Sequence, residues 1–212
     1  PVRYGKPYSA VARLAENIGP FIAMAKALRA QNLSAPEIYA ADLDTGLAIL
    51  EDLGSEAVVD ANGPIRERYA EGVAVLAELH NVGLPESVPL GDGFYKIPPY
   101  DLDAFLIEAE LLTEWYAPHM GLRLSSASMA TFVNLWRARL RDCVEGPRTW
   151  VLRDYHSPNI IWLPQRDGLH RAGIIDFQDC VLGSPAYDVA SLLQDARVVE
   201  HAQGGDGIAR IV

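Results

Sequence analysis

The sequence predicts an α+β fold, with a small α/β part at the start and a mostly helical part after it. Two observations support this prediction. Apolar residues recur with helical spacing over 16–31 and 64–143, whereas short β-branched or aromatic runs bounded by turns occupy 37–50 and 149–176. The chain has 212 residues, half of them hydrophobic, which suffices for one sizeable domain or for two small lobes that share a core.

The first part contains one predicted helix, two strands and a connector. Residues 1–15 show no clear pattern. In 16–31, ENIGPFIAMAKALRAQ, the apolar residues share one helical face, and Pro20 fits the first turn because its missing N–H costs little there. Residues 37–50 predict two short strands around the polar turn 42–46. The segment EDLG, 51–54, is a polar break that leads into the second part.

The second part begins with three amphipathic helices. The first covers 65–80, and the residues 81–99 that follow are rich in Gly and Pro and predict a loop. The second covers 102–116, with Asp101 as its N-cap. The third covers 129–143 and ends at the sequence EGP.

Short strands are predicted at 149–152, 159–163 and 172–176, and a helix at 185–193. If the strands pair, Asp154, Asn159 and Asp176 project from one end of the same small sheet. Two carboxylates and an amide oxygen form a hard oxygen site that suits Mg²⁺. A carboxylate that does not bind the metal could accept the proton of a hydroxyl group. These are the parts that phosphoryl transfer needs.

The composition excludes several partners. The formal net charge of −10 argues against nucleic acid, whose binding depends on neutralised phosphates, but it permits a single nucleotide. No run approaches the roughly 18 apolar residues of a membrane span, and the N-terminus lacks the layout of a secretion signal. Cys143 and Cys180 lie among apolar residues without metal-type spacing, which predicts buried free thiols in a cytoplasmic protein.

Four segments resemble motifs of one family. RDYHSPN, 153–159, is similar to the catalytic loop of kinase-like phosphotransferases, and its His is typical of the aminoglycoside phosphotransferase branch. IIDFQD, 174–179, resembles the metal-binding strand end of that branch, and GSPAYDVASL, 183–192, resembles the segment that follows. LAILEDLG, 47–54, resembles the hinge between two lobes. The resemblance implies a protein-kinase-like, two-lobed fold.

One more segment narrows the resemblance. IPPYDLDAFLIEAELLTEWYAPHMG, 97–121, is similar to bacterial kinases that phosphorylate N-acetylmuramate and N-acetylglucosamine. The whole resemblance covers about residues 16–195. It implies a partial N-lobe in 1–53, with the hinge at 51–53, and a C-lobe in 54–212 that carries the catalytic loop, the metal strand and a helical acceptor-site insert.

The resemblance also implies roles for single residues. Asp154 would accept or orient the acceptor hydroxyl, while Asn159 and Asp176 would bind Mg²⁺ on the ATP phosphates. Asp188 would brace the catalytic loop by accepting backbone N–H groups. His156 could act as a base or ligand, although a structural histidine in the loop is the simpler interpretation. The candidate catalytic residues are therefore Asp154, Arg153, His156 and Asp188.

Other roles concern ATP and the acceptor. Backbone groups of Glu51, Asp52 and Leu53 would bind adenine, and Glu16, on the first helix, would be the partner of a nucleotide-binding lysine. The candidate acceptor pocket in the insert comprises Tyr100, Asp101, Glu108 and Trp115. A helix core for Trp115 and a solvated helix face for Glu108 are the simpler interpretations.

The resemblance predicts an ATP- and Mg²⁺-dependent phosphotransferase that acts on a small hydroxylated molecule, first of all an amino sugar. An aminoglycoside kinase, a kinase for choline or homoserine, and a pseudokinase that only binds are the alternatives. The family's phosphate loop and third N-lobe strand do not precede the helix at 16–31, and the last residues do not continue a helical C-lobe. This predicts either a fragment or a chain whose disordered segments are not represented. The short span from Asp176 to Pro185 argues against a protein kinase.

Overall fold

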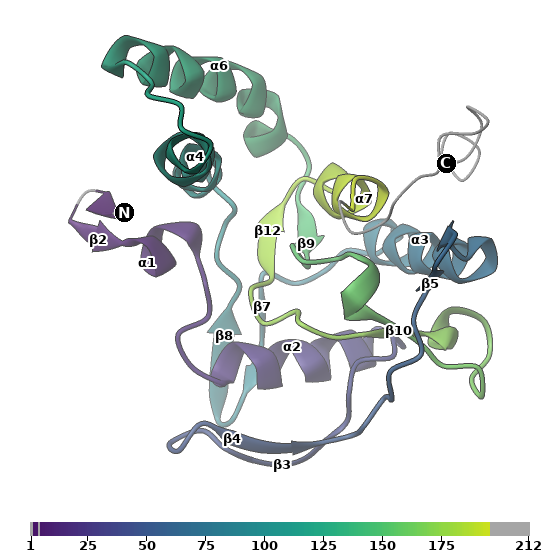
Figure 1. The fold of residues 1–212 in the computed structure, drawn as a ribbon. Coiled ribbons are helices and arrows are strands. Elements are labelled where there is room, and N and C mark those ends of the chain that lie inside the picture. The colour runs from purple at the N-terminus through teal and green to yellow at the C-terminus, as the bar shows by residue number, and fades with distance from the viewer. Residues whose placement is uncertain (1, 4, 196–212) are drawn as a thin grey trace.

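The structure, a computed structural model, describes residues 2, 3 and 5–195. Within these residues the helices are α1 (Tyr8–Ala12), α2 (Gly19–Ala30), α3 (Arg66–Asn81), α4 (Leu102–Leu111), α5 (Ala117–His119), α6 (Ser126–Glu145) and α7 (Ala186–Leu193). Shorter helical turns are the π-helical η1 (Leu112–Tyr116) and the 3₁₀ turns η2 (Ser157–Asn159) and η3 (Gly168–Arg171). Figure 1 shows α4 and α6 together at one end of the molecule, far from the hairpin of β3 and β4.

The strands are β1 (Val2–Arg3), β2 (Lys6–Pro7), β3 (Ile38–Asp42), β4 (Leu47–Leu50), β5 (Val59–Asp60), β6 (Gly63–Pro64), β7 (Ser87–Leu90), β8 (Gly93–Lys96), β9 (Thr149–Val151), β10 (Ile160–Trp162), β11 (Ala172–Ile174) and β12 (Val181–Gly183). In the described chain each strand has one antiparallel partner. The first eight strands form four hairpin ladders, β1 with β2, β3 with β4, β5 with β6 and β7 with β8. Strand β10 pairs with β11, whereas β9 pairs with β12.

The strands around the predicted polar loops form two ladders, so the prediction of one small sheet was wrong. Ile160 of β10 lies opposite Ile174 of β11, and Val151 of β9 lies opposite Val181 of β12. Strand β12 was not predicted, because Val181–Gly183 contains a single β-branched residue and a glycine, which is depleted in strands. Every residue of these four strands is buried except Thr149, which makes both ladders part of the core.

The core lies between α2, α3 and the two ladders. Its largest fully buried side chains include Met24, Leu28, Leu76, Leu79, Trp150, Tyr155 and Phe177. Each such side chain contributes about 1.5–3 kcal/mol by leaving water. The ring of Phe21 on α2 stacks on Phe177, with the ring centroids 5.0 Å apart, so α2 rests on the residue that follows Asp176. Cys180 is buried as predicted, whereas Cys143 on α6 is only partly buried.

Helix α2 begins later than the sequence predicted. The Oδ1 atom of Asn17 accepts a hydrogen bond of 2.8 Å from the backbone N–H of Gly19, and Pro20 occupies the first turn. The local turn that Asn17 forms ends at Gly19, the residue at which the helix starts. Glu16 therefore lies outside the helix, exposed, where it accepts a hydrogen bond of 3.2 Å from Ser9 Oγ. The prediction that Glu16 stands on this helix is wrong.

The segment 81–99 contains a hairpin where the sequence predicted a loop. Strands β7 and β8 pair around Gly91 and Asp92, and Gly91 has φ +55°. Pro89 within β7 concealed the strand, because proline cannot donate to a strand ladder. The turn at 42–46 is confirmed: Asp42 Oδ1 accepts hydrogen bonds from the backbone N–H groups of Asp44 and Thr45.

The three helices of the middle region are confirmed. The second ends at Tyr116 as predicted, with the π-helical turn η1 as its last part, and the third extends beyond its predicted range to the bounds of α6. Asp101 caps α4 as predicted, since its Oδ1 accepts a hydrogen bond of 3.0 Å from the N–H of Ala104. Helix α6 packs on α4 and fully buries only Leu140. No helix in the described part of the chain is long and apolar enough to cross a membrane.

Candidate active site

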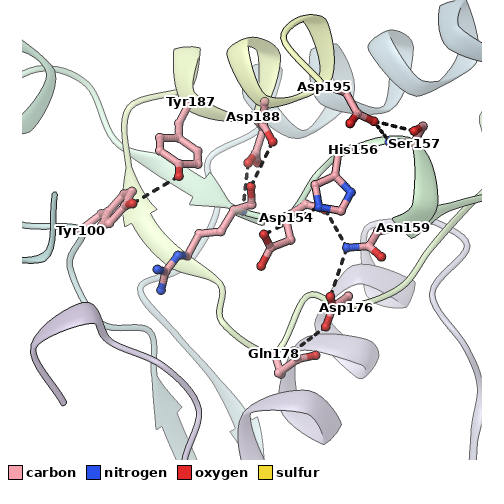
Figure 2. Close-up of polar contacts among 12 residues, drawn as sticks. Tyr100, Asp154, His156, Ser157, Asn159, Asp176, Gln178, Tyr187, Asp188 and Asp195 are labelled. Atoms are coloured by element: carbon pink, nitrogen blue, oxygen red, sulfur yellow. Dashed lines mark hydrogen bonds and ion pairs between the residues drawn. The ribbon is translucent and has the colours of Figure 1, made fainter. Parts of the chain in front are cut away.

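The loop that begins at Leu152 leaves the buried strand β9 and is held from behind by helix α7. Both carboxylate oxygens of Asp188 accept backbone hydrogen bonds, from Leu152 at 2.7 Å and from Arg153 at 2.9 Å. Figure 2 shows Asp188 above this part of the loop. Burial raises the pKa of Asp188 to about 7, and the two N–H donors act in the opposite direction.

Asp154 and Asn159 of this loop lie near Asp176, which follows β11 (Figure 2). The Asn159 amide nitrogen donates to the backbone oxygen of Asp154 at 2.9 Å and to Asp176 Oδ2 at 3.1 Å. Asp176 also accepts a hydrogen bond of 2.7 Å from Gln178. Burial and the Asp176 carboxylate raise the pKa of Asp154, whose side chain is nevertheless 51% exposed. The three side chains thus lie together, as the sequence predicted.

Two residues of the site have left-handed backbone conformations that side chains with a Cβ rarely adopt. Arg153 has φ +68° and Asp176 has φ +60°. Such strained residues persist only where surrounding contacts hold them, and they cluster at active sites. Arg153 directly precedes Asp154, so one of the two strained residues adjoins the predicted proton acceptor and the other is a predicted metal ligand.

The second half of the loop has an anchor that sequence reasoning missed. Asp195, which is 7% exposed, accepts hydrogen bonds from the backbone N–H and the hydroxyl of Ser157, at 2.9 and 2.5 Å. Tyr155 is buried and donates a hydrogen bond of 2.8 Å to the backbone oxygen of Gly72 in α3. Asp195 follows Asp188 by seven residues, two helical turns, and this spacing is the signal that could have revealed it.

His156 lies beside Asp154 without a direct hydrogen bond from its ring. Its Nε2 atom is 3.8 Å from Asp154 Oδ1, and its backbone N–H donates to the oxygen of Asp154 at 3.0 Å. The buried Nδ1 atom has no hydrogen-bond partner among the described residues. A protonated His156 would thus act on Asp154 through its charge.

Tyr100 and Glu108 lie in a buried cluster around the Arg153 side chain. Arg153 pairs with one oxygen of Glu108, and the Tyr100 hydroxyl donates to the other. The Tyr100 and Tyr187 hydroxyl groups are 3.3 Å apart. Burial raises the pKa of Glu108, and the positive charge of Arg153 opposes this rise. The structure therefore joins two predicted acceptor residues to a predicted catalytic residue.

The other two predicted acceptor residues lie outside this cluster. The Asp101 carboxylate caps α4 and pairs with Arg13 at 2.5 Å. Trp115 stands seven residues after Glu108 in η1, and its side chain is 63% exposed. The exposed indole is therefore not part of a helix core.

The predicted hinge is attached to both parts of the chain. The N–H of Glu51 donates to the oxygen of Glu37 at 2.8 Å, so it cannot also donate to an adenine ring. The Glu51 carboxylate pairs with Arg166, which lies between β10 and β11, and is 3.6 Å from Arg29 of α2. The carboxylate therefore links the hinge to its neighbours.

Asp52 and Leu53 complete the hinge. Asp52 Oδ1 accepts a hydrogen bond of 2.8 Å from the N–H of Gly54, which has φ +79°. The Leu53 side chain packs against Gly173 of β11 so closely that a Cβ at position 173 would lie 3.1 Å from Leu53 Cδ1. The hinge backbone is thus held next to the strand that leads to Asp176.

The oxygen atoms of Asp154, Asn159 and Asp176 are the groups of the site that could bind a metal ion. In the described part of the chain, no three His, Cys, Asp or Glu side chains form a group that could hold a metal ion by themselves. Asp176 and the Asn159 amide could supply two hard-oxygen ligands to Mg²⁺, an ion that takes few protein ligands and completes its shell with phosphate and water. With Asp154 as a proton acceptor, the arrangement can support transfer of a phosphoryl group to a hydroxyl group.

Comparisons with known proteins agree with this chemistry. The pattern of the family described as "Phosphotransferase enzyme family" matches residues 6–210. The N-acetylmuramate/N-acetylglucosamine kinase of Caulobacter vibrioides is 37% identical over 195 residues, 90% of this chain and 53% of that protein. The protein of the same name from Pseudomonas putida is 32% identical over 187 residues, 86% of this chain and 51% of that one. The chain spans about half the length of the curated relatives it matches.

A solved structure supports the fold prediction. The choline kinase of Streptococcus pneumoniae superposes with a TM-score of 0.56 at 19% sequence identity. The match covers 84% of this chain and 56% of that chain. The kinase-like fold that the sequence motifs implied is confirmed.

Proposed function

Because the chain belongs to the phosphotransferase enzyme family, we propose that it carries the phosphotransfer site of a small-molecule kinase. In this proposal the γ-phosphoryl group of ATP moves to a hydroxyl group of an amino sugar, N-acetylmuramate or N-acetylglucosamine. The choice of acceptor rests on the relatives of that name at 37% and 32% identity. The observation that carries the proposal is the link through Asn159 between the Asp154 loop and Asp176.

Asp154 is the residue that acts on the acceptor. Its half-exposed carboxylate lies on a loop anchored by Asp188 at one end and by Asp195 at the other, so its position is set before a substrate arrives. In the reaction, the acceptor oxygen bonds to the γ-phosphorus while the bond from that phosphorus to the bridging oxygen breaks and ADP leaves. Asp154 accepts the proton of the acceptor hydroxyl.

Asn159 and Asp176 are the residues that would hold Mg²⁺. The Asn159 amide already faces Asp176, and a half-turn about its Cβ–Cγ bond replaces the amide nitrogen by the oxygen that a cation needs. Asp176 offers two carboxylate oxygens, one of which also accepts from Gln178. When bound, the ion offsets negative charge on the phosphate oxygens.

The nucleotide would lie along the hinge. The backbone of Asp52 and Leu53 is the part of the hinge proposed to bind adenine, since the N–H of Glu51 already has a partner. The proximity of Leu53 to Gly173 supports this placement, because Gly173 lies in β11, which ends two residues before Asp176. The pairing of Glu16 with a nucleotide-binding lysine stays a prediction.

The test is an assay of Mg²⁺-dependent ADP release by the protein expressed from the complete reading frame. The acceptors are N-acetylmuramate, N-acetylglucosamine, kanamycin and choline, each with and without EDTA. The variant Asp154→Asn removes the proton acceptor, and Asp92→Asn makes the same change at an exposed turn between β7 and β8. We expect turnover of an N-acetylated sugar that Asp154→Asn lowers by about 100-fold or more and Asp92→Asn leaves unchanged.

Other outcomes would contradict parts of the proposal. Turnover of kanamycin or choline alone would keep the kinase and reject the amino sugar. No turnover of any acceptor, together with no rise in melting temperature on addition of ATP and Mg²⁺, would reject the kinase, since a ligand of the native state stabilises it.

A further inference from the structure

Arg153 and Glu108 form a buried ion pair between the catalytic loop and helix α4. The Arg153 side chain is 8% exposed and the Glu108 side chain 21%. Arg153 directly precedes Asp154, whereas Glu108 stands on the helix of the predicted acceptor insert, 45 residues earlier in the chain. The pair therefore joins the two regions that must cooperate if an acceptor is to reach Asp154.

Both Nη atoms of Arg153 and both carboxylate oxygens of Glu108 have hydrogen-bond partners within the protein. Arg153 Nη1 donates to the backbone oxygen of Ala12 at the end of α1, at 2.7 Å, and Nη2 donates to Glu108 Oε1. The second Glu108 oxygen accepts from the Tyr100 hydroxyl. The Tyr100 ring also lies against the guanidinium, with 5.2 Å between Arg153 Cζ and the ring centroid. Each Glu108 oxygen thus has a protein partner when no acceptor substrate is bound.

The backbone of Arg153 needs such support. Its φ of +68° is unfavourable for a residue with a side chain. Its N–H is held by Asp188 at 2.9 Å, and its carbonyl oxygen accepts from Ser191 Oγ at 3.3 Å. The side chain is held by Glu108, Ala12 and Tyr100, so the turn that directs Asp154 is fixed from both the backbone and the side chain.

We propose that Glu108 is a positioning residue, which holds the Arg153 side chain and thereby the left-handed turn that presents Asp154 to the acceptor hydroxyl. This proposal rests on the proposed kinase function and deepens it. It replaces the expectation that Glu108 binds the acceptor directly. Removal of the Glu108 charge would leave a buried guanidinium without its counterion, and such a group moves toward other partners or water.

The test is steady-state kinetics of the protein from the complete reading frame, with the acceptor that the wild type turns over. The variants are Glu108→Gln, Arg153→Lys, which keeps the charge but loses the planar fork, and the double variant. Glu78→Gln on the exposed face of α3 and Arg139→Lys on α6 are matched controls. Melting temperatures ensure that each variant is folded at the assay temperature.

We expect Glu108→Gln to lower kcat by about 10- to 100-fold, the effect of misplacing a reacting group, while the KM values for acceptor and ATP change by less than about twofold. The double variant should be no slower than the slower single variant, because both changes remove one interaction. The controls should match the wild type. A merely structural pair would lower the melting temperature and leave kcat unchanged.

Tyr100→Phe keeps the test decisive if Glu108→Gln does not fold. It removes one hydrogen bond to Glu108 without changing charge, and we expect kcat to fall about three- to tenfold at unchanged acceptor KM. Its control is Tyr39→Phe at an exposed ring. A tenfold rise of acceptor KM at wild-type kcat, or kinetics equal to those of the controls, would overturn the role of Glu108 and leave the kinase standing. A wild type that turns over no acceptor and gains no stability from ATP and Mg²⁺ would overturn both the role of Glu108 and the kinase.

Discussion

Replacement of Asp188 by Asn should change how the stability of the protein depends on pH. The Asp188 side chain is buried, and burial raises the pKa of its carboxyl group from the ordinary 3.8 to about 7, against the effect of two backbone N–H donors. Between these values the folded state keeps a proton that the unfolded chain has lost. Stability from this group is therefore complete below the lower pKa and is lost as pH rises through the higher one.

The size of this effect follows from the two pKa values. A rise from 3.8 to about 7 corresponds to about 4 kcal/mol of unfolding free energy. Urea unfolding of the wild type and Asp188→Asn, at several values between about pH 4 and pH 8, measures it. Carboxyl groups far from Asp188 titrate alike in both proteins, so the difference between their stabilities reports Asp188 together with Asp154, whose charge acts on it.

We expect the stability of the wild type minus that of Asp188→Asn to fall by about 4 kcal/mol across this range. The same comparison with the exposed Asp92→Asn should give a nearly constant difference. A difference for Asp188 that stays flat or rises with pH would refute the reasoning. It would mean that the two N–H donors outweigh burial and keep the carboxylate ionised.

Three further predictions concern other parts of the site. Gly173→Ala would place a Cβ 3.1 Å from Leu53 and Leu163 side-chain atoms and 3.2 Å from a backbone oxygen. Urea unfolding should therefore show a loss of about 1–3 kcal/mol in the free energy of unfolding. The control Gly83→Ala, where a Cβ would lie in open space, should show no loss. Asp195→Ala removes the acceptor of two Ser157 hydrogen bonds and should cost roughly 2–4 kcal/mol, and a loss no larger than that of Ser157→Ala would count against a role for the backbone bond. Asn159→Ala should raise the Mg²⁺ concentration for half-maximal turnover at least about 10-fold, and an unaltered Mg²⁺ titration would exclude Asn159 as a ligand.

The elements that sequence alone could predict are those with local signals. The helices α3, α4 and α6 have long apolar stripes, and Asp101 is an ordinary N-cap before one of them. The grouping of Asp154, Asn159 and Asp176 followed from their positions at the ends of short apolar runs. These signals depend on neighbours in sequence, which is why they could be read without a structure.

The features that sequence alone could not predict depend on contacts between distant segments. Glu108 reads as one charge on a helix flank, and only the packing of α4 against α1 and the catalytic loop brings it to Arg153. Strand β12 is three residues long and acquires its identity from its partner β9. Helix α1 has five residues, too few for a periodic pattern, and it lies in a segment that gave no signal.

The stacked rings of Phe21 and Phe177 constrain how the chain can diverge among relatives. The two residues are far apart in sequence, yet each ring fills the space beside the other, and Phe177 follows the Asp176 that would hold the metal. A smaller side chain at one position would open a void next to Asp176 unless the other position or a neighbour compensated. We therefore expect the two positions to covary in an alignment of relatives. Relatives that lack an aromatic residue at one position should more often lack it at the other position as well.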